Sequence, residues 1–263
     1  MTHTSDFSYL SRAMSTSYTS LWFLQHVWFI DRFASLRWNR KSVITLLLLL
    51  ACPTEAIYDI SIVIIKYQEG YLPGSSNQGE YKSKPQSLWS KENQDFVVPI
   101  NYVLCATLSV QTCLLFLLQS FWNYLASNLT RSSFMGSLEF KLYIVFSICS
   151  AILFPTLQFF FSSNQLNSEI APQFAYGIIM LIIALLGFRS DHRFKKLLMQ
   201  TRRLNPTVNV LSKLNYFRYM NQYLTLGLLS GSASLTVLSI DGLTTAKYLN
   251  TTKIYLKIYL WLN

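Results

Sequence analysis

Two acidic residues inside an apolar run are the feature of this sequence that could carry chemistry. Glu55 and Asp59 lie four residues apart within residues 43–65, a run long enough for a membrane-spanning helix, so they share one helix face. An acid inside a span costs about 2.5–3.5 kcal/mol on insertion scales, so it is expected to face the interior of a helix bundle. Asn101, in the next apolar run, falls at a similar depth. We interpret Glu55, Asp59 and Asn101 as a ligand or ion site. A structural polar contact, or a helix shifted so that Asp59 reaches the headgroups, is the alternative.

Other residue types that perform chemistry form no recognisable set. His3, His26 and His192 are scattered, no metal-binding spacing of cysteine or histidine occurs, and the four cysteines lie in apolar runs. We therefore expect no metal, no cofactor, no disulfide and no enzymatic activity. The apolar runs also offer Glu55 and Asp59 no lysine or arginine, so the sequence predicts that these acids lack a counter-ion within the membrane.

The composition places these residues in a membrane protein. The chain has 263 residues, of which 51% are hydrophobic and 13% charged, whereas soluble domains carry about 25% charged residues. We predict an all-α transmembrane helical bundle of six to seven spans, forming a single domain over residues 1–263. The candidate spans are residues 18–30, 43–65, 96–121, 140–161, 173–188 and 223–243, with a partial span at 254–263.

Two of these segments allow two interpretations. Residues 18–30 are apolar but short, and either extend upstream toward Phe7 to cross the membrane or lie in its interface; the residues before them are expected to be exposed. Residues 254–263 are too short to cross, so they are either a truncated last span, which we favour, or an interfacial helix.

The segments between the spans carry structural signals of their own. Residues 66–95 are rich in glycine, serine and proline, which indicates an irregular loop. Residues 189–203 have an amphipathic pattern that predicts a helical extension out of the membrane. Gly227 and Gly231 predict a close approach of residues 223–243 to a neighbouring helix.

The distribution of lysine and arginine predicts the orientation. If every candidate span crosses, residues 31–41, 122–141 and 189–221 share one side and carry 14 lysines and arginines, against six on the other. The richer side is expected to be cytoplasmic, which puts the N-terminus outside; if residues 18–30 do not cross, the N-terminus is cytoplasmic. The cytoplasmic basic loop contains Arg189, Arg193, Lys195, Lys196, Arg202 and Arg203.

The second half of the chain resembles uncharacterised seven-helix, receptor-like multi-pass membrane proteins of fungi. The residues that suggest it are Phe188-Arg189, Phe194-Lys195-Lys196, Asn215-Tyr216-Phe217 and Asp241-Gly242-Leu243-Thr244. The resemblance implies a G-protein-coupled-receptor-like topology with the last helix truncated, and it implies no ligand.

The chain departs from the large rhodopsin-like receptor family. Trp122-Asn123-Tyr124 stands near the place of that family's acid-arginine-tyrosine motif, and residues 162–172 hold no cysteine for its usual disulfide. Coupling to a G protein is therefore an analogy from topology alone.

These observations give a leading function and two alternatives. We expect a receptor-like or sensory protein that is integral to a plasma or internal membrane and that engages a cytoplasmic signalling partner at residues 189–221. The alternatives are a transporter or channel component that uses the intramembrane acids, and a structural membrane scaffold. The net charge of +10 is explained by residues that face lipid headgroups, so the lipid bilayer is the expected partner and nucleic acid is not.

Overall fold

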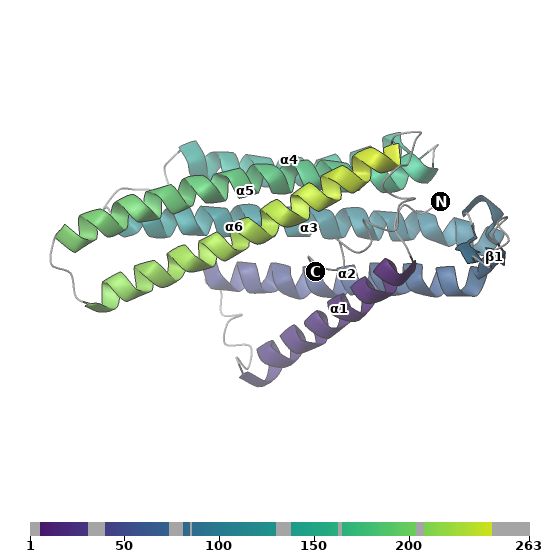
Figure 1. The fold of residues 1–263 in the computed structure, drawn as a ribbon, viewed down its shortest axis with the longest axis horizontal. Helices are drawn as coiled ribbons and strands as arrows, with labels where there is room; N and C mark the ends of the chain where they lie inside the picture. Colours follow the sequence, from purple (N-terminus) through teal and green to yellow (C-terminus); the bar gives the residue numbers. More distant parts are fainter. Residues whose placement is uncertain are drawn as a thin grey trace.

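The computed structural model describes residues 6–30, 40–73, 81–84, 86–129, 138–162, 165–203 and 208–243, most of which are helical (Figure 1). The elements are α1 Asp6–Gln25, the π-helix η1 His26–Ile30, α2 Arg40–Glu69, β1 Tyr71–Pro73, β2 Tyr81–Ser83, the 3-10 helix η3 Gln86–Leu88, α3 Lys91–Leu129, α4 Leu138–Phe160, α5 Gln165–Arg203 and α6 Val208–Leu243.

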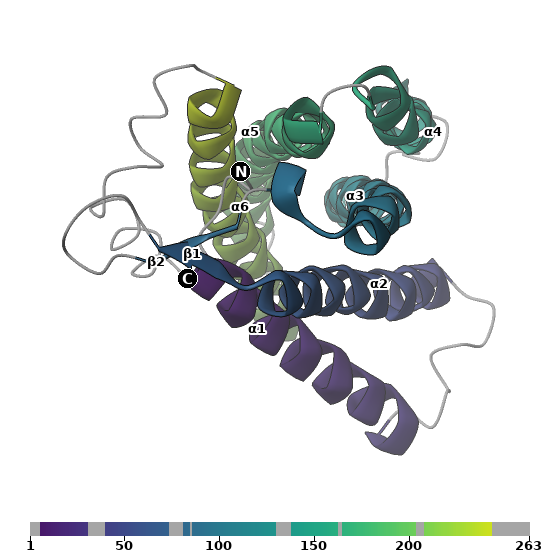
Figure 2. The same cartoon turned by 90° about the vertical axis from the view of Figure 1, so that its right-hand side faces the viewer.

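The helices α2 to α6 run lengthwise along the bundle, and α1 lies obliquely across α2 (Figure 1). Viewed from the end, α3 occupies the centre and α6 stands at the edge beside α5 (Figure 2). Accordingly α3 contacts α2, α4 and α5, whereas α6 packs mainly along α5, and α1 packs on α2. The core therefore forms around α3.

Five helices in the described part of the chain are long and apolar enough to cross a membrane: Val43–Glu69, Lys91–Asn123, Lys141–Phe160, Asn167–Gln200 and Leu211–Leu243. The predicted class, a multi-pass helical membrane protein, is thus confirmed. The segment predicted at residues 18–30 is not among the five. Residues 254–263 lie outside the described residues, so the predicted truncated last span stays a prediction.

Several helices are longer than the sequence predicted. The helix α5 begins at Gln165 and continues to Arg203, so residues predicted as a loop before it are helical. The reason is tertiary packing: Ile170 is fully buried and Glu169 nearly so, which outweighs the turn-forming residues around them. The expected helical extension beyond residue 189 is confirmed.

The loop predicted at residues 66–95 is only partly irregular. The helix α2 continues through it to Glu69 and ends at Gly70, whose φ of 76° suits glycine. The short strands β1 and β2 then pair antiparallel, with Leu72 opposite Lys82. This small hairpin and η3 lie together at one end of the bundle (Figures 1 and 2).

The close contact between α5 and α6 depends on glycines other than those expected. A Cβ at Gly187 would overlap the Thr225 hydroxyl, and one at Gly177 would lie 2.8 Å from Thr236 Oγ1. In contrast, a Cβ at Gly227 would meet no atom within 4 Å. The predicted close approach is confirmed at Gly231, where a Cβ would lie 3.5 Å from Met180 Cε on α5, but not at Gly227. The tightest contacts come from Gly177 and Gly187 on α5.

Large apolar side chains cover the outside of the helices. Exposed examples are Leu50 and Ile60 on α2, Phe146 and Ile152 on α4, and Leu226 on α6. A soluble domain rarely exposes so much contiguous apolar surface, whereas lipid chains would cover it.

Candidate functional site

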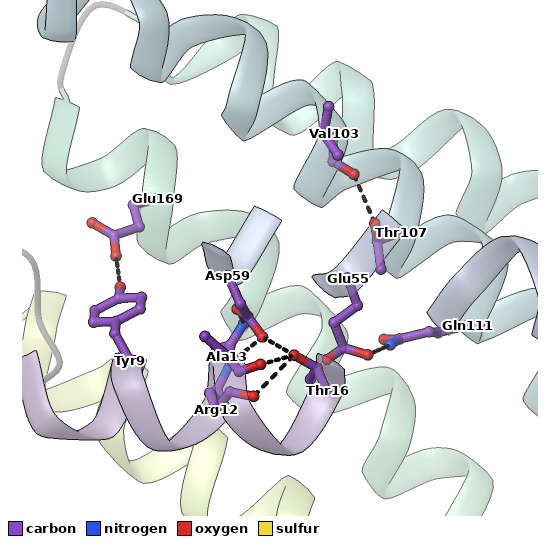
Figure 3. A network of polar contacts seen from close by, with 10 residues as sticks. All are labelled: Tyr9, Arg12, Ala13, Thr16, Glu55, Asp59, Val103, Thr107, Gln111 and Glu169. Atoms are coloured by element: carbon purple, nitrogen blue, oxygen red, sulfur yellow. Dashed lines mark hydrogen bonds and ion pairs between the residues drawn. The ribbon is translucent and has the colours of Figure 1, made fainter. Parts of the chain in front are cut away.

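Asp59 is the most enclosed charge of the candidate site. Its side chain is fully buried in the bundle, where the Arg12 guanidinium binds it through two nitrogens: Nη2 lies 2.5 Å from Oδ1, and Nε donates to Oδ2 at 3.3 Å. Thr16 also donates to Oδ2, at 3.2 Å (Figure 3). The expectation that the acids lack a counter-ion within the bundle is therefore wrong, because α1 supplies one.

One face of the helix α1 turns polar residues toward the bundle, and its outer face mixes large apolar residues with small hydroxyl residues such as Ser15 and Thr19. Tyr9, Arg12, Thr16 and Ser20 recur at three- and four-residue spacing, which places them on one helix face, and Tyr9 and Ser20 are buried. The residues before Tyr18, expected to be exposed, thus include buried ones. Exposed apolar residues on α1 and η1 are Met14, Tyr18, Leu21, Trp22, Trp28 and Phe29. The large exposed apolar side chains suit contact with lipid, and the buried polar ones suit the interior of the bundle.

Glu55, one turn earlier on α2, contacts α3 instead of α1. The Gln111 amide donates to Glu55 Oε2 at 2.7 Å (Figure 3), which confirms that Gln111 makes an interhelical hydrogen bond. Thr107, nearby on α3, donates to the carbonyl of Val103 in its own helix at 2.9 Å. Within the described part of the chain, Gln111 is thus the only side chain that hydrogen-bonds Glu55.

A third buried acid, Glu169, extends this network toward the end of the bundle that carries β1 and η3. The Tyr9 hydroxyl donates to Glu169 Oε1 at 2.7 Å. The buried Lys66 ammonium lies over the Tyr9 ring, 4.1 Å from its centroid, a distance at which the cation is attracted to the ring. Glu169 was not predicted as part of the site because residues 162–172 were expected to be a loop. Lys66 was not predicted because it lies just after the expected span, residues 43–65.

Asn101 was expected to form one site with Glu55 and Asp59, and it does not. It instead lines a small pocket at the same end of the bundle, together with Tyr9, Tyr58, Ile62, Gln86, Trp89, Val97 and Glu169. The cavity volume is about 10 Å³, close to the lower limit for one water molecule. The pocket is thus far smaller than one that encloses a small-molecule ligand.

The opposite end of the bundle holds a second polar cluster. Gln119 donates to Ser190 Oγ at 2.6 Å, and the Asn123 amide donates to the Tyr143 hydroxyl at 2.8 Å. Ser190 and Arg193 each donate to Asn123 Oδ1 at 3.2 Å. These contacts join α3, α4 and α5, and the one charged side chain among them, Arg193, binds an amide oxygen. We therefore interpret the cluster as structural.

The predicted basic loop is largely helical and partly paired. Lys195 and Arg218 both contact Asp191, at 3.3 and 3.0 Å, and Arg189 also has a partner. Arg193 binds Asn123, Lys196 is exposed, and the side chains of Arg202 and Arg203 lie outside the described set. Phe194, Leu197 and Leu214 form an apolar core between α5 and α6 at this end.

No family model, curated protein or solved structure matches the chain.

Proposed function

We propose that the protein is a transporter or channel component that moves protons or small monovalent cations through the polar core between α1, α2, α3 and α5. This is the alternative function that the sequence suggested from Glu55 and Asp59. The observation that carries the proposal is the charge balance of that core.

The described part of this core contains the acids Glu55, Asp59 and Glu169 but only two cations, Arg12 and Lys66. Arg12 binds Asp59 directly. Lys66 lies on the ring of Tyr9, and Tyr9 in turn donates to Glu169. Arg12 also attracts the Glu55 carboxylate without binding it. Glu55 is therefore the acid of this core that has no directly bound cation, and its hydrogen-bond partner Gln111 is a neutral amide.

A carboxylate with no directly bound cation in a membrane interior is costly, and such residues usually mark a path for ions or protons. A bound proton or cation would neutralise Glu55 and remove that cost. Glu55 thus has the chemistry of an acid that is loaded and unloaded during transport, whereas Asp59 is already neutralised by Arg12 and suits a structural role beside it.

The test is a flux measurement on purified protein in proteoliposomes. Proton entry would be followed with an enclosed pH-sensitive dye, and sodium or potassium entry with radioactive tracers. The unmodified protein should conduct at least one of these ions, and Glu55→Gln should abolish the flux while the protein still inserts and stays folded. Glu92→Gln is the matched control, because Glu92 is an exposed acid at the start of α3. Full flux in Glu55→Gln would refute the proposal.

A receptor-like signalling role is the second candidate, and the length of α5 and α6 favours it. These helices have 39 and 36 residues, which makes them about 58 and 54 Å long, whereas a hydrocarbon core is about 30 Å thick. Their connected ends would therefore project from the membrane as a basic helical pair. If that pair engages an acidic signalling protein, Lys196→Glu should weaken the recovery of that protein in a pull-down, and Glu55→Gln should not.

A further inference from the structure

Glu69, the last residue of α2, fastens a short segment over one end of the bundle. Its carboxylate accepts hydrogen bonds from Lys84 Nζ at 2.8 Å, from the Ser90 backbone N–H at 2.7 Å and from Asn93 Nδ2 at 2.7 Å. Its side chain is only 5% exposed. One carboxylate thus ties the end of α2 to the residues after β2 and to the start of α3.

The fastened segment turns one aromatic ring inward. Trp89 is buried, and its indole N–H donates to the Lys84 carbonyl at 2.8 Å. Leu88, its neighbour, is 55% exposed. The Gln94 amide donates to the carbonyls of Gln86 and Trp89 at 3.2 and 3.0 Å, which holds the segment against α3.

The buried Trp89 lines the water-sized pocket that reaches Asn101 and Glu169. Asn101 is only 7% exposed, and its side chain lines this pocket. An amide that faces a space of this size favours a water molecule in it, because the amide can both donate and accept a hydrogen bond. We therefore expect the space beside Asn101 to hold a polar ligand of about the size of a water molecule.

We propose that the pocket between Asn101 and Glu169 binds water and is the entry to the acidic core, and that Trp89 is a lid over this entry, held shut by Glu69. The role of entry to a transport path rests on the proposed function, whereas the lid itself is a property of the fold. Water or a proton would reach Glu169 and Tyr9 from this end only when the segment that carries Trp89 moves away.

The lid can be tested by labelling a cysteine placed beneath it. In a protein whose four native cysteines are replaced by alanine, Asn101→Cys would be reacted with a membrane-impermeant thiol reagent in nanodiscs, which leave both faces open. With the lid intact the reaction should be slow. Trp89→Ala and, independently, Glu69→Gln should each accelerate it about tenfold.

Two controls and the second lid variant keep the result specific. Glu92→Gln removes an exposed acid at the same end and should not change the rate. Tyr102→Cys lies on the exposed side of α3, next to Asn101, and its rate should not respond to Trp89→Ala. Glu69→Gln keeps the indole in the core, so it tests the lid even if Trp89→Ala fails to fold. Equal Asn101→Cys rates with and without the lid substitutions, or an equal acceleration at Tyr102→Cys, would overturn the proposal.

The two proposals fail in different ways. Flux that depends on Glu55, together with an unchanged labelling rate, would remove the lid and leave the transport function. Labelling that responds to the lid, together with full flux in Glu55→Gln, would keep the lid and remove the transport function.

Discussion

The pairing of Arg12 with Asp59 makes each residue dependent on the other. Asp59 is fully buried, whereas the Arg12 side chain is 34% exposed. Arg12→Met would leave a buried carboxylate without its cation, which we expect to lower the free energy of unfolding by about 3 kcal/mol. Thermal unfolding of the purified protein in detergent would measure the loss.

The double variant Arg12→Met/Asp59→Asn should recover a large part of that stability, because no isolated charge remains. Lys195→Met is the matched control. Lys195 is 48% exposed and pairs with Asp191 one turn away, so its loss should cost less than about 1 kcal/mol. If Arg12→Met and Lys195→Met lowered the free energy of unfolding equally, Arg12 would not be the essential counter-ion of Asp59.

At the level of helices, the contact between α5 and α6 requires the absence of a side chain at Gly187. Gly187→Ala would place a methyl group against Thr225, so we expect the helices to separate and the melting temperature to fall by several degrees. Gly227→Ala, in the neighbouring helix, meets open space and should be neutral or slightly stabilising, because alanine favours helix over glycine by about 1 kcal/mol. Parallel melting curves would decide; a similar response of both variants would refute the packing account.

The apolar runs were sufficient to predict where the five spanning helices lie, but not where they begin and end. Hydropathy identifies only the apolar part of a helix, so the polar first turns of α3 and α5 were assigned to loops. The polar face of α1 was visible as the spacing of Tyr9, Arg12, Thr16 and Ser20, but its meaning depends on α2 being its neighbour.

The candidate site was predicted in the same partial way. The sequence located Glu55 and Asp59 inside the bundle, because an acid in an apolar run has few other places to lie. Their partners could not be predicted, since Arg12 is 47 residues and Gln111 is 56 residues away along the chain. Asn101 was predicted to join them, but it lines the pocket that Glu169 also lines.

For the whole molecule, the orientation in the membrane is the property that remains a prediction, and it depends on α1. The contacts Tyr9 with Lys66 and Arg12 with Asp59 place α1 antiparallel to α2, as a helix that crosses would be. We expect an epitope tag before Met1 to be detected on intact cells. Detection only after permeabilisation would show that α1 does not cross.

The basic ends of α5 and α6 should lie on the cytoplasmic side, because they carry the densest lysine and arginine of the chain. Ser212 is exposed there, so Ser212→Cys should react with an impermeant thiol reagent only after permeabilisation. Reaction in intact cells would reverse the predicted orientation.

The ion pair between α1 and α2 also sets an order of events during synthesis. Arg12 leaves the ribosome before its partner, and the 47 residues that separate it from Asp59 take about 2 to 10 seconds to translate at 5–20 residues per second. If α1 crosses the membrane, as predicted, its insertion ahead of α2 would leave Arg12 without the Asp59 carboxylate during that interval. In that case a chain that stalls before Asp59 would present an unpaired Arg12, which makes the joint insertion of α1 and α2 a point at which quality control could act.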